Sequence, residues 1–338
     1  DPLRICHVSS EIAPFAKTGG LADVAAGLGR YLGEAGHDIR LFLPLYKRIR
    51  EGDFELTPST EQQDMALTLG GTKYRFSIQT TPLPGSESTW IYLVDCPELF
   101  DRDDIYTEDD DAVRFAFLCR AVLESCQRMQ WGPDVFHLND WHTGLLPLYL
   151  KTRYAWDELF SDSQTLLAIH NIGYQGVFPS KILPDLDLMA QRRHLSQKDL
   201  GDSVINYLRT GLTHADAIST VSRTYAFEIQ TAEYGMGLED LLRERRADLT
   251  GIVNGVDYGD WNPETDPHIA HPFGPGDLEG KAKDKVALLE EMGLEHDDDA
   301  PVIGIVSRMT SQKGFELLKE ILPLVLQRQD LRLVVLLS

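Results

Sequence analysis

The residues with the clearest chemical potential near the start of the chain form the loop Lys17-Thr18-Gly19-Gly20. Glycines let the backbone approach a ligand closely, a helix N-terminus offers N–H groups, and a lysine adds a full positive charge. The loop follows the first apolar run and leads into an Ala- and Leu-rich segment, which is where open α/β sheets bind ligands. We therefore predict a site for a phosphorylated ligand here, with a plain turn and a solvated lysine as the alternative.

A second candidate is His137-Leu138-Asn139-Asp140-Trp141-His142, at the end of another apolar run. A carboxylate beside a tryptophan suits a sugar, because the hydroxyls need polar partners and the ring offers a stacking surface. The residue types of His137, Asp140 and His142 also suit a metal site, but no carboxylate–histidine cluster elsewhere in the sequence completes it. Sugar binding is the favoured interpretation, and a metal site or a purely structural cluster are the alternatives.

The same pattern follows the next apolar run, in His170-Asn171-Ile172-Gly173-Tyr174-Gln175-Gly176. Two successive strands that end in histidine and amide side chains point into one cleft. We therefore predict that His170 and Asn171 belong to one site with Asp140. The alternative is that His170 is a structural histidine with its hydrogen bonds satisfied.

The fourth candidate is the loop Ser307-Arg308-Met309-Thr310-Ser311-Gln312-Lys313-Gly314. Arg308 and Lys313 flank the start of a helix, an arrangement that would clamp a diphosphate. The chain has 32 Lys and Arg against 53 Asp and Glu, a net charge of −21, so a local basic cluster is informative and a merely solvated loop is less favoured. The same acidity repels phosphate backbones and anionic lipids, so neither a nucleic acid nor a membrane is expected as a partner.

The elements that must position these loops alternate along the chain. Residues 3–44 predict strand, loop, helix and strand, and the glycines at 70 and 71 lie between two alternating segments that predict an antiparallel hairpin. Later segments continue the alternation, with a helix expected over residues 203–213. Strands that alternate with helices predict a mostly parallel, doubly wound α/β sheet.

The length of 338 residues suggests two domains, because single cores seldom grow beyond roughly 250 to 300 residues. We expect a first domain over residues 1–261, a linker rich in Pro, Gly, His and Asp over residues 262–280, and the first part of a second domain over residues 281–338. One strand-helix-strand unit does not bury both faces of a sheet, so the second domain is expected to continue beyond Ser338.

The cysteines and the hydropathy of the chain give an expectation for its cellular location. The four cysteines are Cys6, Cys96, Cys119 and Cys126. They are scattered and form no Cys-x-x-Cys pair, so they suggest neither a zinc ribbon nor a disulfide framework. No apolar run approaches the ~20 residues of a membrane helix. A cytoplasmic location is expected.

Taken in order, these motifs resemble those of bacterial glycogen synthases and plant starch synthases. The resemblance rests on five segments that span nearly the whole chain: Lys17-Thr18-Gly19-Gly20-Leu21, Asp140-Trp141-His142, His170 to Gly176, Asn254-Gly255-Val256-Asp257, and Ser307-Arg308 with Gln312-Lys313-Gly314. Each segment alone is weak, whereas five in the right order are specific.

The resemblance implies a GT-B architecture, in which two Rossmann-like domains face each other across a cleft. It implies transfer of glucose from ADP-glucose to the non-reducing end of an α-1,4-glucan with retention of configuration, and neither a cofactor nor a metal is required. By motif match, Arg308 and Lys313 hold the diphosphate, Lys17 contacts the donor from the opposite domain, His170 binds the transferred glucose, and Asp140 lies near the reacting sugar. The remaining donor-binding residues implied are Gly19, Gly20, Asn171 and Asn254.

Several departures from the family pattern stand out. Arg223 stands where the family usually has Pro, and Arg209-Thr210 stand where Lys-Gly is usual; both affect packing more than chemistry. The essential glutamate and the second glycine-rich loop of the family are expected beyond Ser338, so residues 1–338 alone are expected to be inactive. Two alternatives stay open: an inert glucan-binding protein, and a related transferase with another donor, such as a sucrose synthase type. The oligomeric state is not predicted.

Overall fold

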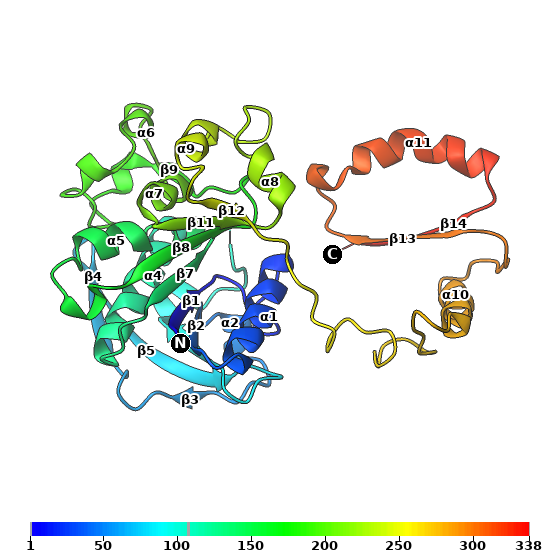
Figure 1. The fold of residues 1–338 in the computed structure, drawn as a ribbon, viewed down its shortest axis with the longest axis horizontal. Helices are drawn as coiled ribbons and strands as arrows, with labels where there is room; N and C mark the ends of the chain where they lie inside the picture. The colour runs from blue at the N-terminus through cyan, green and yellow to red at the C-terminus, as the bar shows by residue number, and fades with distance from the viewer. Residues whose placement is uncertain (1, 107–108, 338) are drawn as a thin grey trace. The chain divides into compact units, whose positions relative to one another are not determined.

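The computed structural model describes residues 2–106 and 109–337. The chain divides into two compact units, Asp1–Gly255 and Val256–Ser338 (Figure 1). The predicted linker, residues 262–280, lies inside the second unit. The roles assigned to the two predicted domains stay predictions.

The first unit is built on one mixed sheet. Its strands are β1 (Arg4–Val8), β2 (Asp38–Pro44), β3 (Thr57–Pro58), β4 (Met65–Leu69), β5 (Thr72–Pro82), β6 (Trp90–Asp95), β7 (Val135–Asn139), β8 (Gln164–Ile169), β11 (Ala217–Thr220) and β12 (Leu249–Gly251). They run in the order β12-β11-β8-β7-β1-β2-β6-β5-β3, and β4 pairs with β5. All neighbours from β12 to β6 are parallel, which confirms the predicted parallel α/β sheet.

Helices connect these strands and cover the sheet. They are α1 (Gly20–Glu34), α2 (Lys47–Arg50), α3 (Pro97–Phe100), α4 (Asp111–Arg128), α5 (Leu146–Thr152), α6 (Gln197–Gly201), α7 (Tyr207–His214), α8 (Arg223–Glu228) and α9 (Glu239–Glu244). Most residues of α4 are buried, and Phe117 of this helix is fully buried, as are Phe42 of β2 and Phe136 of β7. Burial of such aromatic side chains supplies much of the hydrophobic stabilisation.

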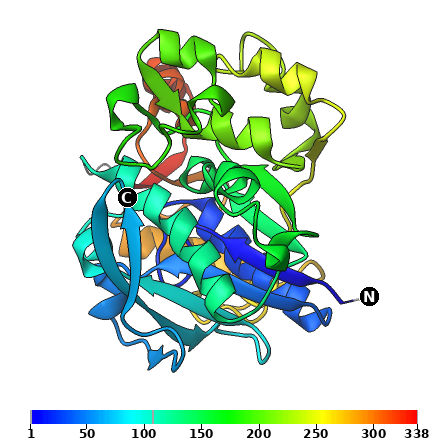
Figure 2. The same ribbon diagram turned by 90° about the vertical axis from the view of Figure 1, so that its left-hand side faces the viewer.

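The predicted antiparallel hairpin is confirmed. β4 pairs with β5 from Met65 opposite Phe76 to Leu69 opposite Thr72, and Gly70 and Gly71 form the turn with φ values of 58° and 82° (Figure 2). Positive φ at both turn residues is what glycine permits. A hydrogen bond of 3.2 Å from the Gly70 N–H to the Asp187 carboxylate ties the turn to a distant loop.

The helix predicted over residues 203–213 is wrong in its first part. Residues Val204–Asn206 form a short strand, β10, which pairs antiparallel with β9 (Val177–Pro179). The helix α7 begins only at Tyr207, because the Asn206 side chain accepts a hydrogen bond from the Arg209 N–H and caps it. An N-cap residue has non-helical backbone angles, which ends the strand and starts the helix at one point.

The second unit contains one parallel strand pair. Its elements are α10 (Glu279–Glu291), β13 (Val302–Ser307), α11 (Phe315–Arg328) and β14 (Arg332–Leu337). β13 and β14 pair from Val302 opposite Arg332 to Ser307 opposite Leu337. Among the helices that the structure describes, none is both long enough and apolar enough to cross a membrane.

Candidate active site

The carboxyl ends of β7 and β8 bring three predicted site residues together. Asp140 directly follows β7, and His170 and Asn171 directly follow β8, its parallel neighbour. The Oδ1 atom of Asp140 accepts hydrogen bonds from the backbone N–H of His170, at 2.8 Å, and from that of Asn171, at 3.3 Å. One carboxylate therefore fixes the two loops to each other.

Asp140 holds a backbone conformation that residues other than glycine rarely adopt. Its φ is 54° and its ψ is −169°, a region that costs about 1–3 kcal/mol. Its hydrogen bonds offset this strain, since its N–H also donates to the Ala168 carbonyl at 2.9 Å. Burial raises the pKa of the Asp140 carboxyl to about 7, against the hydrogen bonds from His170 and Asn171 that lower it. A strained backbone and a carboxyl that titrates near neutrality are both features of functional positions.

Glu11, which the sequence analysis did not single out, organises the loop that contains Lys17. Its buried carboxylate accepts hydrogen bonds from the backbone N–H of Thr18, at 2.5 Å, and of Gly19, at 3.1 Å. The hydroxyls of Thr18 and Tyr106 donate to the same carboxylate at 2.7 and 2.6 Å. Two N–H groups that were expected to face a phosphate therefore already have an anionic acceptor. The sequence contains one signal for this role, because Glu11 is the only carboxylate between β1 and α1. A buried carboxylate needs hydrogen-bond donors nearby.

Lys17 is the part of this loop that stays available to a ligand. Its ammonium group lies 2.7 Å from the Asp23 carboxylate, and the two side chains are 48% and 39% exposed. A pair this exposed contributes little stability, so Lys17 can exchange Asp23 for an anionic ligand at low cost. Gly20 opens α1, where a Cβ would meet no atom within 4 Å, so the structure imposes no steric need for glycine at that position.

Burial keeps the histidines of this region neutral. It lowers the pKa of His170 to about 4, and burial together with the nearby His170 lowers the pKa of His137 to about 4. The pKa of the fully buried His7 also lies well below its ordinary value, through burial and then through His137 and His170. At neutral pH each ring therefore has one donor nitrogen and one acceptor nitrogen.

These lowered pKa values predict acid sensitivity. In the unfolded chain the histidines take up protons as the pH falls below 6.5, whereas folded His137 and His170 resist protonation down to about 4. Their contribution to stability is therefore complete above pH 6.5 and is lost as the pH falls through that window. We expect the stability loss between pH 7 and pH 5 to be about 2 kcal/mol smaller in His137→Gln than in the wild type.

Urea unfolding curves at the two pH values measure this difference. Asp140 acts in the opposite direction, because its raised pKa adds stability as the pH falls from about 7. Both proteins contain Asp140, so its effect cancels in the comparison. Equal pH dependence in the wild type and His137→Gln would contradict the prediction.

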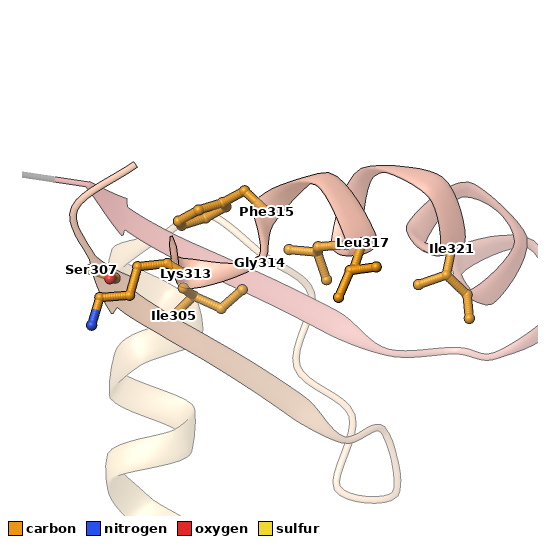
Figure 3. A pocket seen from close by; sticks show the side chains of 8 residues that line it. Ile305, Ser307, Lys313, Gly314, Phe315, Leu317 and Ile321 are labelled. Atoms are coloured by element: carbon orange, nitrogen blue, oxygen red, sulfur yellow. The ribbon is translucent and has the colours of Figure 1, made fainter. Parts of the chain in front are cut away.

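Arg308 and Lys313 lie in the second unit, between β13 and α11. A short 3-10 turn, Ser311–Lys313, precedes α11, and Gly314 caps the helix with a φ of 74°. Lys313 is exposed and Arg308 is half-buried. Figure 3 shows Ser307 and Lys313 at the end of β13, where they line a hollow of about 540 Å³ whose other walls are mainly apolar.

The other predicted residues are less closely connected to the cluster of Asp140, His170 and Asn171. Asn254 lies beyond β12, is exposed, and makes no side-chain hydrogen bond within the described part of the chain. The alternative metal ligands do not form a site, since residues 2–106 and 109–337 contain no group of three or more His, Cys, Asp or Glu that could hold a metal ion. His142 packs instead against the rings of Tyr106 and Phe115, each with its centroid 4.6 Å away.

A second hollow lies beside the cluster of Asp140, His170 and Asn171. It has a volume of about 510 Å³ and is lined by Asp111, Trp141, residues 173–178 and Met236. Gly176 lies directly against Trp141, where a Cβ would approach the indole ring to 2.3 Å. Glycine is needed there for this close approach and for its φ of 61°.

Comparison with known proteins decides the family. The family model described as the starch synthase catalytic domain matches residues 4–244. The chain belongs to this family. The glycogen synthase of Moorella thermoacetica is 41% identical to it over 335 residues, which cover 99% of this chain and 67% of that protein. The glycogen synthase of Desulforudis audaxviator is 40% identical over 345 residues, with the same coverage of 99% and 67%.

A solved structure agrees with the sequence matches. The catalytic domain of starch synthase IV from Arabidopsis thaliana, bound to ADP and acarbose, matches with a TM-score of 0.91 at 30% identity, over 99% of this chain and 68% of that chain. The predicted resemblance to glycogen and starch synthases and the GT-B type of α/β fold are thereby confirmed. The enzyme class, a glucosyltransferase of glycogen or starch synthesis, is confirmed as well. The cytoplasmic location and the roles of single site residues stay predictions.

Proposed function

We propose that this enzyme transfers glucose from ADP-glucose to the non-reducing end of an α-1,4-glucan with retention of configuration. The observation that carries the proposal is the close structural likeness to a starch synthase catalytic domain whose bound ligands are ADP and acarbose. ADP is the nucleotide released when ADP-glucose gives up its sugar, and acarbose is a glucan mimic. The glycogen synthases that match nearly the whole chain support the same acceptor.

The proposed reaction develops negative charge on the departing nucleotide. The bond between the anomeric carbon and the diphosphate oxygen breaks, and its electron pair leaves with ADP. The 4-hydroxyl of the acceptor bonds to the same face of the sugar, and its proton passes to the departing phosphate. Arg308 and Lys313 would stabilise this charge in place of a metal ion, and a preorganised donor of this kind is worth about 10² to 10³ in rate.

The first unit would supply the sugar-binding groups. Lys17 would contact the donor, and neutral His170 would hydrogen-bond the transferred glucose next to the Asp140 carboxyl. The hollow beside Trp141 supports binding of the glucan acceptor by the first unit, because it combines aromatic surface with the Asp111 carboxylate. The other donor contacts that we propose are Gly19, Gly20, Asn171 and Asn254.

The direct test supplies the full-length protein with ADP-glucose and glycogen. We expect ADP release together with elongation of the glucan, no loss of activity in EDTA, and retained anomeric configuration by NMR. Glycogen binding without ADP release would favour an inert glucan-binding protein. Preference for UDP-glucose with fructose over ADP-glucose with glycogen would favour a sucrose synthase type.

A further inference from the structure

Four polar residues of the first unit form one hydrogen-bonded chain behind the proposed sugar site. His7 and His137 are direct partners in the pairing of β1 with β7, and their Nδ1 atoms lie 2.9 Å apart. Asn139 follows His137 by two residues and therefore lies on the same face of β7. Its amide nitrogen lies 3.3 Å from Nε2 of His7, and its amide oxygen lies 2.9 Å from Nε2 of His170. The chain runs from His137 through His7 and Asn139 to His170.

One backbone carbonyl determines the orientation of the central amide. The amide nitrogen of Asn139 lies 2.8 Å from the carbonyl oxygen of Val8, and a carbonyl oxygen only accepts. The nitrogen end must therefore face Val8 and His7, and the oxygen end must face His170. Because that oxygen also only accepts, His170 must carry a proton on Nε2.

The same reasoning assigns the protons of the other two rings. The second N–H of the Asn139 amide donates to Nε2 of His7, so the single proton of His7 lies on Nδ1. That proton is donated to Nδ1 of His137, which leaves the proton of His137 on Nε2. A doubly protonated His7 would face the Asn139 amide donor to donor, so the chain is satisfied only when His7 is neutral.

We propose that Asn139 and His7 are positioning residues that hold His170 as the Nε2-protonated tautomer, with its Nδ1 lone pair free to accept a hydrogen bond from a hydroxyl of the transferred glucose. Nδ1 of His170 makes no hydrogen bond to the described residues, and the ring is only partly buried. The inference rests on the proposed function, in which His170 contacts the donor sugar. The proposed reaction otherwise leaves His7 and Asn139 unused. The inference gives them a role, which is to determine which nitrogen of His170 carries the proton and which one accepts a hydrogen bond from the sugar.

NMR of the wild-type enzyme tests the proton assignments without any substitution. Long-range ¹⁵N–¹H correlation spectra of histidine-labelled protein distinguish the two neutral tautomers by their nitrogen shifts. We expect the Nε2–H form for His170 and His137 and the Nδ1–H form for His7. An Nδ1–H form of His170 or an Nε2–H form of His7 would overturn the proposal.

Asn139→Asp separates positioning from simple packing. The carboxylate keeps an acceptor for His170 but loses both donated hydrogen bonds, so His7 is expected to change to its Nε2–H form. Its negative charge beside Nε2 of His170 also favours the doubly protonated ring, whose Nδ1 no longer accepts, so turnover is expected to fall about tenfold. The matched control is Asn262→Asp, at a half-buried residue of the second unit whose side-chain oxygen accepts a hydrogen bond from the Glu264 N–H, and it should leave both unchanged. An unaltered His7 tautomer and unaltered turnover in Asn139→Asp would overturn the proposal. If the tautomers are as expected but His170→Ala retains full turnover, the hydrogen-bonded chain stands and the proposed contact of His170 with glucose is wrong.

Discussion

Replacement of Arg308 by alanine in the full-length enzyme is expected to lower turnover by about 10² to 10³, the effect of removing one preorganised donor from a developing charge. Lys313→Ala is expected to act in the same range, because both residues lie in the short segment between β13 and α11. Lys17→Ala should lower turnover by about 10² as well, since the lysine can leave Asp23 for the donor. The measurement is the turnover number with ADP-glucose and glycogen, both at saturation.

The control for these variants is Lys319→Ala, which removes the same charge from an exposed position of α11. Its turnover should match that of the wild type. A rise in KM with unchanged turnover would mean that the basic residues bind the donor equally in the ground state and the transition state. Near-normal turnover in all three alanine variants would refute the assignment of the diphosphate site.

Glu11→Ala is expected to lower the free energy of unfolding by about 3 kcal/mol, because it leaves four donors around a buried side chain without their acceptor. The donors are two backbone N–H groups and two hydroxyls, from Thr18, Gly19 and Tyr106. Loss of these bonds frees the loop that holds Lys17, so turnover should fall too. Urea unfolding measures the first effect, and the glucan elongation assay measures the second.

Glu11→Gln refines this prediction. The glutamine oxygen can accept from the Thr18 and Gly19 N–H groups, while its NH₂ donates to the two hydroxyls, which reverse their roles. We therefore expect Glu11→Gln to retain most of the stability that Glu11→Ala loses. The matched control is Glu34→Ala, at the exposed end of α1. A loss below about 1 kcal/mol in Glu11→Ala would show that water replaces the carboxylate without penalty.

Much of the fold follows from local patterns in the sequence. The strand, helix and strand predicted over residues 3–44 form as β1, α1 and β2, and the Gly70-Gly71 hairpin forms as its alternating flanks require. The short strand β10 was missed because its three residues pair only with β9, a segment distant in sequence. No local signal distinguishes such a strand from the start of the helix that follows it.

The candidate site, too, could be predicted from the sequence only in part. Asp140 and His170 could be placed together, because each follows a strand and parallel strands end at one edge of a sheet. The roles of Glu11 and Asn139 depend on which atoms their side chains face, and this is set by strand register and by loop conformation. A sequence lists the donors and acceptors of a site but does not pair them.

The carboxylate of Glu11 has a further consequence for how the enzyme meets its ligands. Phosphate-binding loops built on backbone N–H groups readily hold sulfate or phosphate in place of a substrate. In this enzyme the chain itself provides the anion for the N–H groups of Thr18 and Gly19. The loop is thus preorganised before any nucleotide arrives, and small inorganic oxyanions in a buffer do not compete for those two groups.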